Sequence, residues 1–169
     1  MTRDSIIAWI IANDEGGIVD APGDPGGRTN KGISQRFLDS VREEYAGTLP
    51  ATVDELSDAA IAALYVAYFW NPIQGDRLPP GLALTVMDAA VNQGPPTAVM
   101  VLQQAVGVSV DGRMGPATLS AIQGMGDKAL AEFTARRAVR YAQLQGPEGQ
   151  FELGWMRRLI RVYTASVVA

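Results

Sequence analysis

The first part of the chain combines an apolar run with a glycine-rich segment. Of all the features of the sequence, this combination restricts the possible fold most strongly. The run from Ile6 to Glu15 has helical spacing, and Gly16-Gly17 follow it at once. Consecutive glycines usually end a helix, because they adopt backbone conformations that other residues avoid. Glycine, proline and aspartate are frequent from Ile18 to Ile33, which predicts turns or a short hairpin there rather than a helix.

Glu15 stands at the expected end of this first helix. A carboxylate at a helix C-terminus meets the negative end of the helix dipole and unpaired carbonyl groups, and both disfavour its ionised form. We therefore expect the pKa of Glu15 to lie above the usual range for glutamate, as a general acid near neutral pH requires. A solvated surface glutamate is nevertheless the commoner residue before a helix stop, so spacing alone does not establish catalysis.

The residue composition excludes several kinds of catalytic site. The 169 residues include no histidine and no cysteine, which excludes the usual zinc sites and nucleophile–histidine pairs. Carboxylates remain as the obvious catalytic groups, and we predict neither a metal nor another cofactor. Hydrophobic residues make up 47% and charged residues 19%, a balance typical of a globular chain. The net charge of −4 argues against nucleic acid as a partner.

Helical patterns occupy most of the remaining chain, which predicts a mainly α fold with a small hairpin or turn-rich lobe after the first helix. Ser34 is placed to cap a helix through about Tyr45. Either Thr52 or Ser57 can start the next helix, which ends before Pro72. Further helices are expected over residues 82–92, 97–106, 116–123, 127–145 and 151–167.

The segment 82–92 is apolar nearly all round and predicts the most buried helix. Asp88 within it is a carboxylate that needs partners, and we predict a structural pairing with an arginine such as Arg158 or with a helix N-terminus. The arginines of RRAVR and RRLIR otherwise predict solvated basic faces. Asn92 either caps the end of the helix or faces a sugar.

Aromatic side chains gather before Pro72, in the sequence YVAYFWN. Such a cluster usually belongs to the core. Sugar rings also stack on aromatic faces, so Tyr68 and Trp70 are candidates for the edge of a sugar-binding cleft.

The motifs around Glu15 resemble those of glycoside hydrolase family 108. DEGG followed by DPGGRTNKGIS is similar to the EGGY and DPGG-x-TNKGIT segments of that family. The similarity continues through YFWNPIQGDRLPPGLALTVMDAAVNQGPPTAVMVLQQAVG and FELGWMRRLIRV, and so covers nearly the whole chain. One departure is that Ile18 replaces the tyrosine of EGGY, which affects any substrate contact of that ring but not the acid.

The resemblance implies an N-acetylmuramidase, a lysozyme that cleaves the β-1,4 bond between N-acetylmuramic acid and N-acetylglucosamine in peptidoglycan. It implies that Glu15 is the catalytic acid. The order Glu15, Asp24, Thr29 also resembles that of phage-type lysozymes, in which the aspartate stabilises positive charge and the threonine helps to hold the attacking water. Asp20 is a rival for the second carboxylate. The candidate substrate-binding residues are Asn30, Tyr68, Trp70 and Asn92, and Lys31 is a further positioning candidate.

A second resemblance concerns the C-terminal part. VDGRMGPATLSAI is similar to the VDG-x-x-GP-x-T segment of small peptidoglycan-binding helical modules. We therefore expect a lysozyme-like catalytic region at 1–92 and a helical, peptidoglycan-binding-like subdomain at 93–169, packed on it as a single compact unit. The subdomain either binds the wall independently or serves only as a structural part.

The expected partner is the glycan strand of peptidoglycan, acted on by a monomer without a membrane-spanning segment. Residues 1–17 lack the layout of a signal peptide, whereas the substrate lies outside the inner membrane. We expect synthesis in the bacterial cytoplasm and release to the periplasm with the help of a holin, as for a phage or prophage endolysin or a lysis protein of a phage-like particle. A lytic transglycosylase, which needs only one acid/base, and a non-catalytic wall-binding protein are the alternatives.

Overall fold

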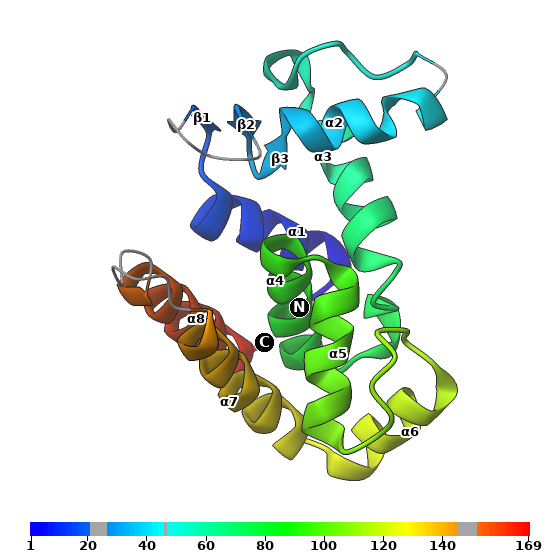
Figure 1. Cartoon of the computed structure of the whole chain (residues 1–169), viewed down its shortest axis with the longest axis vertical. Coiled ribbons are helices and arrows are strands. Elements are labelled where there is room, and N and C mark those ends of the chain that lie inside the picture. The colour runs from blue at the N-terminus through cyan, green and yellow to red at the C-terminus, as the bar shows by residue number, and fades with distance from the viewer. Residues whose placement is uncertain (21–26, 46, 145–151) are drawn as a thin grey trace. The chain divides into compact units, whose positions relative to one another are not determined.

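The computed structural model of the chain describes residues 1–20, 27–45, 47–144 and 152–169. It consists mainly of helices with one small antiparallel sheet, which confirms the predicted fold class (Figure 1). The chain forms two compact units, one of Ile7–Ala67 and one of Met1–Ile6 with Tyr68–Ala169. The predicted boundary between a catalytic region and a binding subdomain at residues 92 and 93 stays a prediction.

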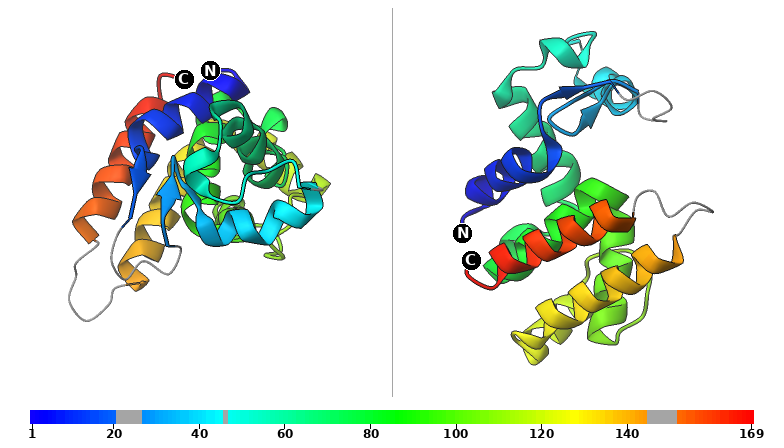
Figure 2. Two further views of the ribbon diagram at one scale, coloured as in Figure 1. Left: turned by 90° about the horizontal axis from the view of Figure 1, so that it is seen from above. Right: turned by 90° about the vertical axis from the view of Figure 1, so that its left-hand side faces the viewer.

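The smaller unit, Ile7–Ala67, contains the sheet. Helix α1 (Arg3–Ile10) continues as a π-helical turn, η1 (Ile11–Glu15), and Gly16 ends it with a φ of 59°. The predicted helix stop at the glycines is therefore present. The three short strands lie next to one another in the order β1-β2-β3 (Figure 2). They are β1 (Ile18–Val19), β2 (Thr29–Asn30) and β3 (Ile33–Ser34).

Two serines begin the helices that follow the sheet. The Ser34 hydroxyl accepts a hydrogen bond of 3.1 Å from the backbone N–H of Phe37, as the sequence predicts. Of the two starts that the sequence allows for the next helix, Ser57 makes the cap, because its hydroxyl accepts from the Ala60 N–H at 3.2 Å. Thr52 instead precedes a separate 3₁₀ turn. These elements are α2 (Gln35–Val41), η2 (Arg42–Tyr45), η3 (Val53–Glu55), α3 (Asp58–Tyr65) and the π-helical turn η4 (Val66–Trp70).

The larger unit is built of helices. Helix α4 packs against α5 and α8, and α7 lies beside both α5 and α8 (Figures 1 and 2). Every residue of α4 from Leu82 to Ala90 is buried, which confirms the prediction for this segment. No helix in the described part of the chain has the length and hydropathy needed to cross a bilayer. The elements are η5 (Gly75–Arg77), α4 (Pro80–Gln93), α5 (Pro95–Val106), α6 (Pro116–Met125), α7 (Lys128–Gln143) and α8 (Glu152–Ser166).

Asp88 of α4 is fully buried and pairs with two arginines. Its Oδ1 is 2.8 Å from Arg158 of α8, which confirms the predicted partner. Its Oδ2 is 2.7 Å from Arg137 of α7, whose side chain is also fully buried. The prediction that the arginines of RRAVR form a solvated face is therefore wrong for Arg137. The physical reason is that a buried carboxylate has two oxygens to satisfy, and one arginine covers only one of them here.

Gln103 of α5 organises the turn that carries the VDG motif. Its side-chain carbonyl accepts from the backbone N–H groups of Asp111 and Gly112 at 3.0 and 2.9 Å. Its amide donates to Asp111 Oδ1 at 2.7 Å. This hydrogen bond is the main reason why the pKa of Asp111 lies below its usual value. The motif therefore has a structural role in the larger unit.

Candidate active site

Glu15 is the last residue of η1, so the structure confirms its predicted place at a helix C-terminus. Gly16 follows with φ 59° and ψ −154°, a backbone conformation that is open essentially to glycine alone. Strand β1 begins at Ile18, and the chain therefore passes from the helix end almost directly into the sheet. A short π-helical segment of this kind is frequent at functional sites. The side chain of Glu15 lies outside the described part of the structure.

The sheet brings Thr29 back to the segment that follows Glu15. Thr29 of β2 pairs with Val19 of β1, and the N–H of Lys31 donates to the carbonyl of Gly17 at 3.2 Å. The Thr29 hydroxyl is 3.4 Å from the Val19 carbonyl, longer than the roughly 2.5–3.0 Å usual for such a bond. This weakly held hydroxyl is half-buried and can still bind a water molecule.

Of the two candidates for the second carboxylate, Asp20 and Asp24, only Asp20 lies in the described part of the structure. Asp20 lies 3.6 Å from Nη1 of Arg28. Arg28 also donates through Nε to both carboxylate oxygens of Asp54, at 2.7 and 3.0 Å. The hydrogen bond to Asp54 and the attraction of its charge raise the pKa of Arg28. Asp20 is thus part of a charged group in the lobe, whereas Asp24 lies outside the described residues.

Asn30 and Lys31 hold the sheet to its neighbours in the smaller unit. Asn30 is 7% exposed, and its side-chain amide donates to the Val53 carbonyl at 2.8 Å. Lys31 has a φ of 47°, its ammonium is 2.5 Å from Asp58, and its carbonyl accepts from the Tyr65 hydroxyl at 2.9 Å. Both residues therefore have structural partners, and their contact with substrate stays a prediction. In the described part of the chain, no cluster of acidic side chains is suited to hold a metal ion.

Trp70 is 3% exposed in the larger unit, which favours a core role over a place at a cleft edge. Its ring packs on Gly75, where a Cβ would clash with the indole carbons. Its Nε1 has no hydrogen-bond partner among the described residues. Tyr68 is half-buried. Both predicted roles of its ring, in the core or at the edge of a sugar-binding cleft, stay predictions.

Asn92 is exposed on the last turn of α4, and it is not the C-cap. Gly94 takes that position, with its N–H bonded to the Ala90 carbonyl, so the capping alternative is wrong. A glycine suits the site because its φ is 85°, which Asn would adopt at a cost. The other alternative, that Asn92 faces a sugar, stays a prediction.

Two known protein families match successive parts of the chain. Residues 8–94 match glycosyl hydrolase 108, and residues 97–160 match a predicted peptidoglycan domain. The chain belongs to glycosyl hydrolase family 108. A solved structure of SagA from Brucella abortus is 33% identical, with a TM-score of 0.83, over 97% of this chain and 95% of that one. The search among curated proteins found no match.

Membership of family 108 confirms the resemblance found in the sequence motifs. Together with the peptidoglycan-domain match, it shows that the chain is a glycoside hydrolase acting on peptidoglycan. The family match includes Glu15, the strands after it and Asn92. The alternative that the whole chain is a non-catalytic wall-binding protein is therefore excluded.

In this family 108 chain, a hydrogen-bond series leads from the buried Asp88 to the exposed Asn92. Arg137 Nη2 donates to the Tyr141 hydroxyl at 2.8 Å, and that hydroxyl is 2.9 Å from Asn92 Oδ1. Arginine can only donate, so the hydroxyl must give its single proton to Asn92. The orientation of the Asn92 amide is thereby fixed, with its NH₂ group left to bind a ligand.

The sequence pattern does not indicate that Tyr141 or Arg137 is connected with Asn92. The available signal was their spacing of four on a helix, which places both on one face of α7. Nothing in that spacing indicates that Asn92, 49 positions away from Tyr141, is the partner.

Proposed function

We propose that this hydrolase cleaves the β-1,4 bond between N-acetylmuramic acid and N-acetylglucosamine, with Glu15 as the general acid. The observation that carries the proposal is the backbone position of Glu15. It ends a helix at Gly16, and the next segment is the strand that pairs with the strand of Thr29. A helix C-terminus favours the protonated form of a carboxyl group, which is the form that an acid catalyst must have before the reaction.

In the proposed reaction, the Glu15 carboxyl group gives its proton to the glycosidic oxygen while the bond from that oxygen to the anomeric carbon breaks. The Asp24 carboxylate stabilises the positive charge that develops on the sugar. A water molecule held by the Thr29 hydroxyl then adds to the anomeric carbon. In this inverting reaction the proton of the water passes to Asp24. In a retaining reaction Asp24 would instead bond to the anomeric carbon, and a water molecule that gives its proton to Glu15 would then break that bond.

Asn92 is proposed to contact the substrate through its side-chain NH₂ group. The bond from Tyr141 to Asn92 Oδ1 holds the amide in one orientation, and the amide hydrogens remain as donors. The carbonyl of an N-acetyl group is an acceptor of the matching kind. A donor held in place before binding loses less conformational entropy than a mobile one.

The cellular setting is part of the proposal, because the substrate lies outside the inner membrane. We propose that the chain acts in the periplasm as a monomer, after release with the help of a holin, in the manner of a phage or prophage endolysin. Fractionation of cells that express the chain with and without a holin tests the release. Light scattering of the purified chain tests the monomer.

Product analysis tests the reaction itself. Digested peptidoglycan is reduced with borohydride, and the new sugar ends are identified by mass spectrometry. A muramidase yields N-acetylmuramitol ends. Products lighter by one water, with anhydro ends, would assign the chain to the lytic transglycosylases instead, and N-acetylglucosaminitol ends would move the cleavage to the other glycosidic bond.

A further inference from the structure

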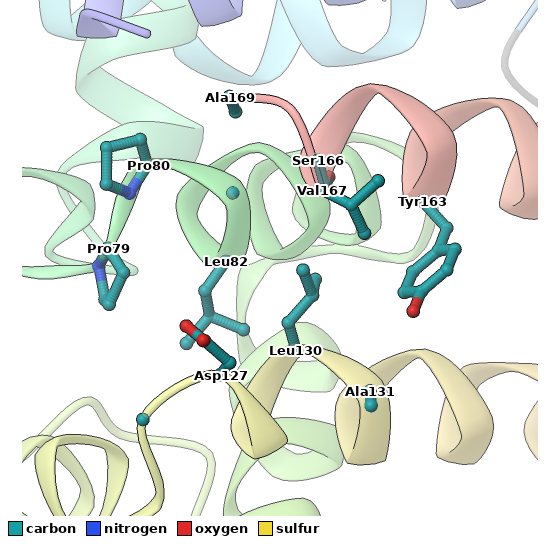
Figure 3. Close-up of a pocket in the computed structure, with 12 residues that line it drawn as sticks. Pro79, Pro80, Leu82, Asp127, Leu130, Ala131, Tyr163, Ser166, Val167 and Ala169 are labelled. Atoms are coloured by element: carbon teal, nitrogen blue, oxygen red, sulfur yellow. The ribbon is translucent and has the colours of Figure 1, made fainter.

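A pocket of about 400 Å³ lies in the larger unit, where the starts of α4 and α7 meet the end of α8 (Figure 3). None of its lining residues belongs to the smaller unit, which contains Glu15 and Thr29. Most of its side chains are apolar, and they come from three separate stretches of the chain. They include Pro79, Pro80, Leu82, Leu130, Tyr163 and Val167.

One edge of this pocket is held closely together. A Cβ on Gly81 would clash with the backbone carbonyl of Ser166, so only glycine allows the end of α8 to lie so near the start of α4. The Ser166 and Thr85 hydroxyls form a buried hydrogen bond of 2.6 Å across the same two helices. The pocket is therefore formed by fixed helix ends, as expected of a binding site that exists before its ligand arrives.

Asp127 is the single residue with a charged side chain among those that line the pocket, and it is exposed to solvent. It precedes α7 at the N-cap position, but its side chain makes no capping hydrogen bond. Figure 3 shows its carboxylate directed toward Leu82, between the two helix starts. No other described residue forms a hydrogen bond or an ion pair with this carboxylate, so it is available to a ligand.

A carboxylate among apolar walls suits a ligand that has a short aliphatic body and a cationic group. The ring of Tyr163, which is 37% exposed, lies at the opposite end of the pocket from Asp127 in Figure 3 and adds an apolar face there. In peptidoglycan, the diamino acid of the stem peptide has an amine on an aliphatic chain, next to the methyl groups of alanine residues. We propose that this pocket binds the stem peptide, with Asp127 accepting a hydrogen bond from the ammonium group of the diamino acid.

This proposal depends on the proposed function in one respect only, namely that the substrate is peptidoglycan. The match of residues 97–160 to a predicted peptidoglycan domain includes Asp127 and Leu130, and so agrees with a wall-binding role for this end of α7. Binding at the pocket is separate from cleavage and can be measured without it.

The test measures binding in the Glu15→Gln protein, with probes that are disaccharide products of a muramidase and so lack the bond that the proposed reaction cuts. The probes are a disaccharide–tetrapeptide muropeptide, the same muropeptide with its amine acetylated, and the disaccharide without peptide. Calorimetry should show the tightest binding for the free amine. In Asp127→Asn its affinity should fall about tenfold, because a charge-assisted hydrogen bond is lost. The acetylated muropeptide should bind equally to both proteins.

Glu132→Gln is the matched control, because Glu132 is an exposed carboxylate of the same helix that does not line the pocket. Equal loss of affinity in this variant would overturn the proposal in favour of general electrostatic attraction. Equal binding of the muropeptide and the bare disaccharide would overturn it in favour of a glycan site. Neither result affects the assignment of Glu15. Conversely, clearing of peptidoglycan suspensions by folded Glu15→Gln would remove that assignment and leave the pocket untouched.

Discussion

Arg137 Nη2 lies 2.7 Å from Oδ2 of Asp88, and neither side chain is exposed to solvent. Arg158 reaches the other oxygen of the same carboxylate at 2.8 Å. One carboxylate on α4 therefore joins α7 and α8, the two helices that complete the larger unit. Removing the Asp88 carboxylate would leave two arginines without a counter-charge. The free-energy cost of such an unpaired buried charge is larger than the net stabilisation that the ion pair provides.

Asp88→Asn should therefore destabilise the larger unit strongly. Removing one partner of a buried ion pair typically costs about 3–5 kcal/mol, because the remaining charge stays buried and uncompensated. Urea unfolding at neutral pH measures the change. Asp76→Asn, at an exposed aspartate of η5, is the control and should stay within about 0.5 kcal/mol of the parent. A similar small change in Asp88→Asn would contradict the argument.

Glu15→Gln should lower the clearing of peptidoglycan suspensions by at least about 10²–10⁴-fold, the usual contribution of general acid–base catalysis. Glutamine keeps the size and most hydrogen bonds of the side chain but cannot deliver a proton. Thermal stability should hold or rise slightly, since a charge is removed from a helix C-terminus. Glu43→Gln, at an exposed glutamate of η2, should remain active. Near-normal clearing by folded Glu15→Gln would exclude Glu15 as the acid.

Asp24→Asn and Asp20→Asn together identify the second carboxylate. If Asp24 only stabilises charge and water, its change should reduce kcat less than Glu15→Gln does, whereas an essential base would give a comparable loss. Asp20 already has Arg28 as a partner at 3.6 Å, so Asp20→Asn should have the smaller effect. Steady-state hydrolysis of soluble glycan fragments measures both. A larger loss in Asp20→Asn would exchange the two roles.

Tyr141→Phe should reduce kcat/KM through Asn92. The phenyl ring keeps the stacking on Trp155, whose centroid is 5.3 Å away, but the hydroxyl that orients the Asn92 amide is lost. We expect a loss of a few-fold, and about tenfold for Asn92→Ala. In the Asn92→Ala background, Tyr141→Phe should cause no further loss of activity, although it should still lower stability by about 1–2 kcal/mol. Additive losses of activity would show that Tyr141 does not act through Asn92.

Asp111 should make the chain more sensitive to acid. Hydrogen bonds from Gln103 and from the Arg113 backbone lower the folded-state pKa of Asp111 below its ordinary value of 3.8. Its ionised form thus stabilises the fold above about pH 4, and this contribution is lost as the pH falls through the lower folded-state pKa. Melting curves of the parent and Asp111→Asn should differ at pH 6 and converge toward about pH 2. A constant difference between the two curves would contradict this linkage.

Several features follow from the sequence because they depend on neighbouring residues. The glycines after Glu15 end the helix, Ser34 caps the next one, and the apolar stretch 82–90 is buried. Each of these is decided within about one helical turn, by backbone conformation, a local hydrogen bond or a run of apolar side chains. The same local information placed Glu15 at a helix end, and the motifs around it indicated the family.

Other features required the tertiary structure. Arg137 is a charged residue in an arginine-rich helical segment, which is typical of a solvated helix face. Only its pairing with Asp88, 49 residues earlier in the chain, explains its burial. The bond from Tyr141 to Asn92 and the pocket beside Asp127 likewise join residues from separate helices. Helical periodicity tells which side chains share a face, but not which face of another helix they meet. That choice depends on the packing of the whole unit, which no single segment of the sequence contains.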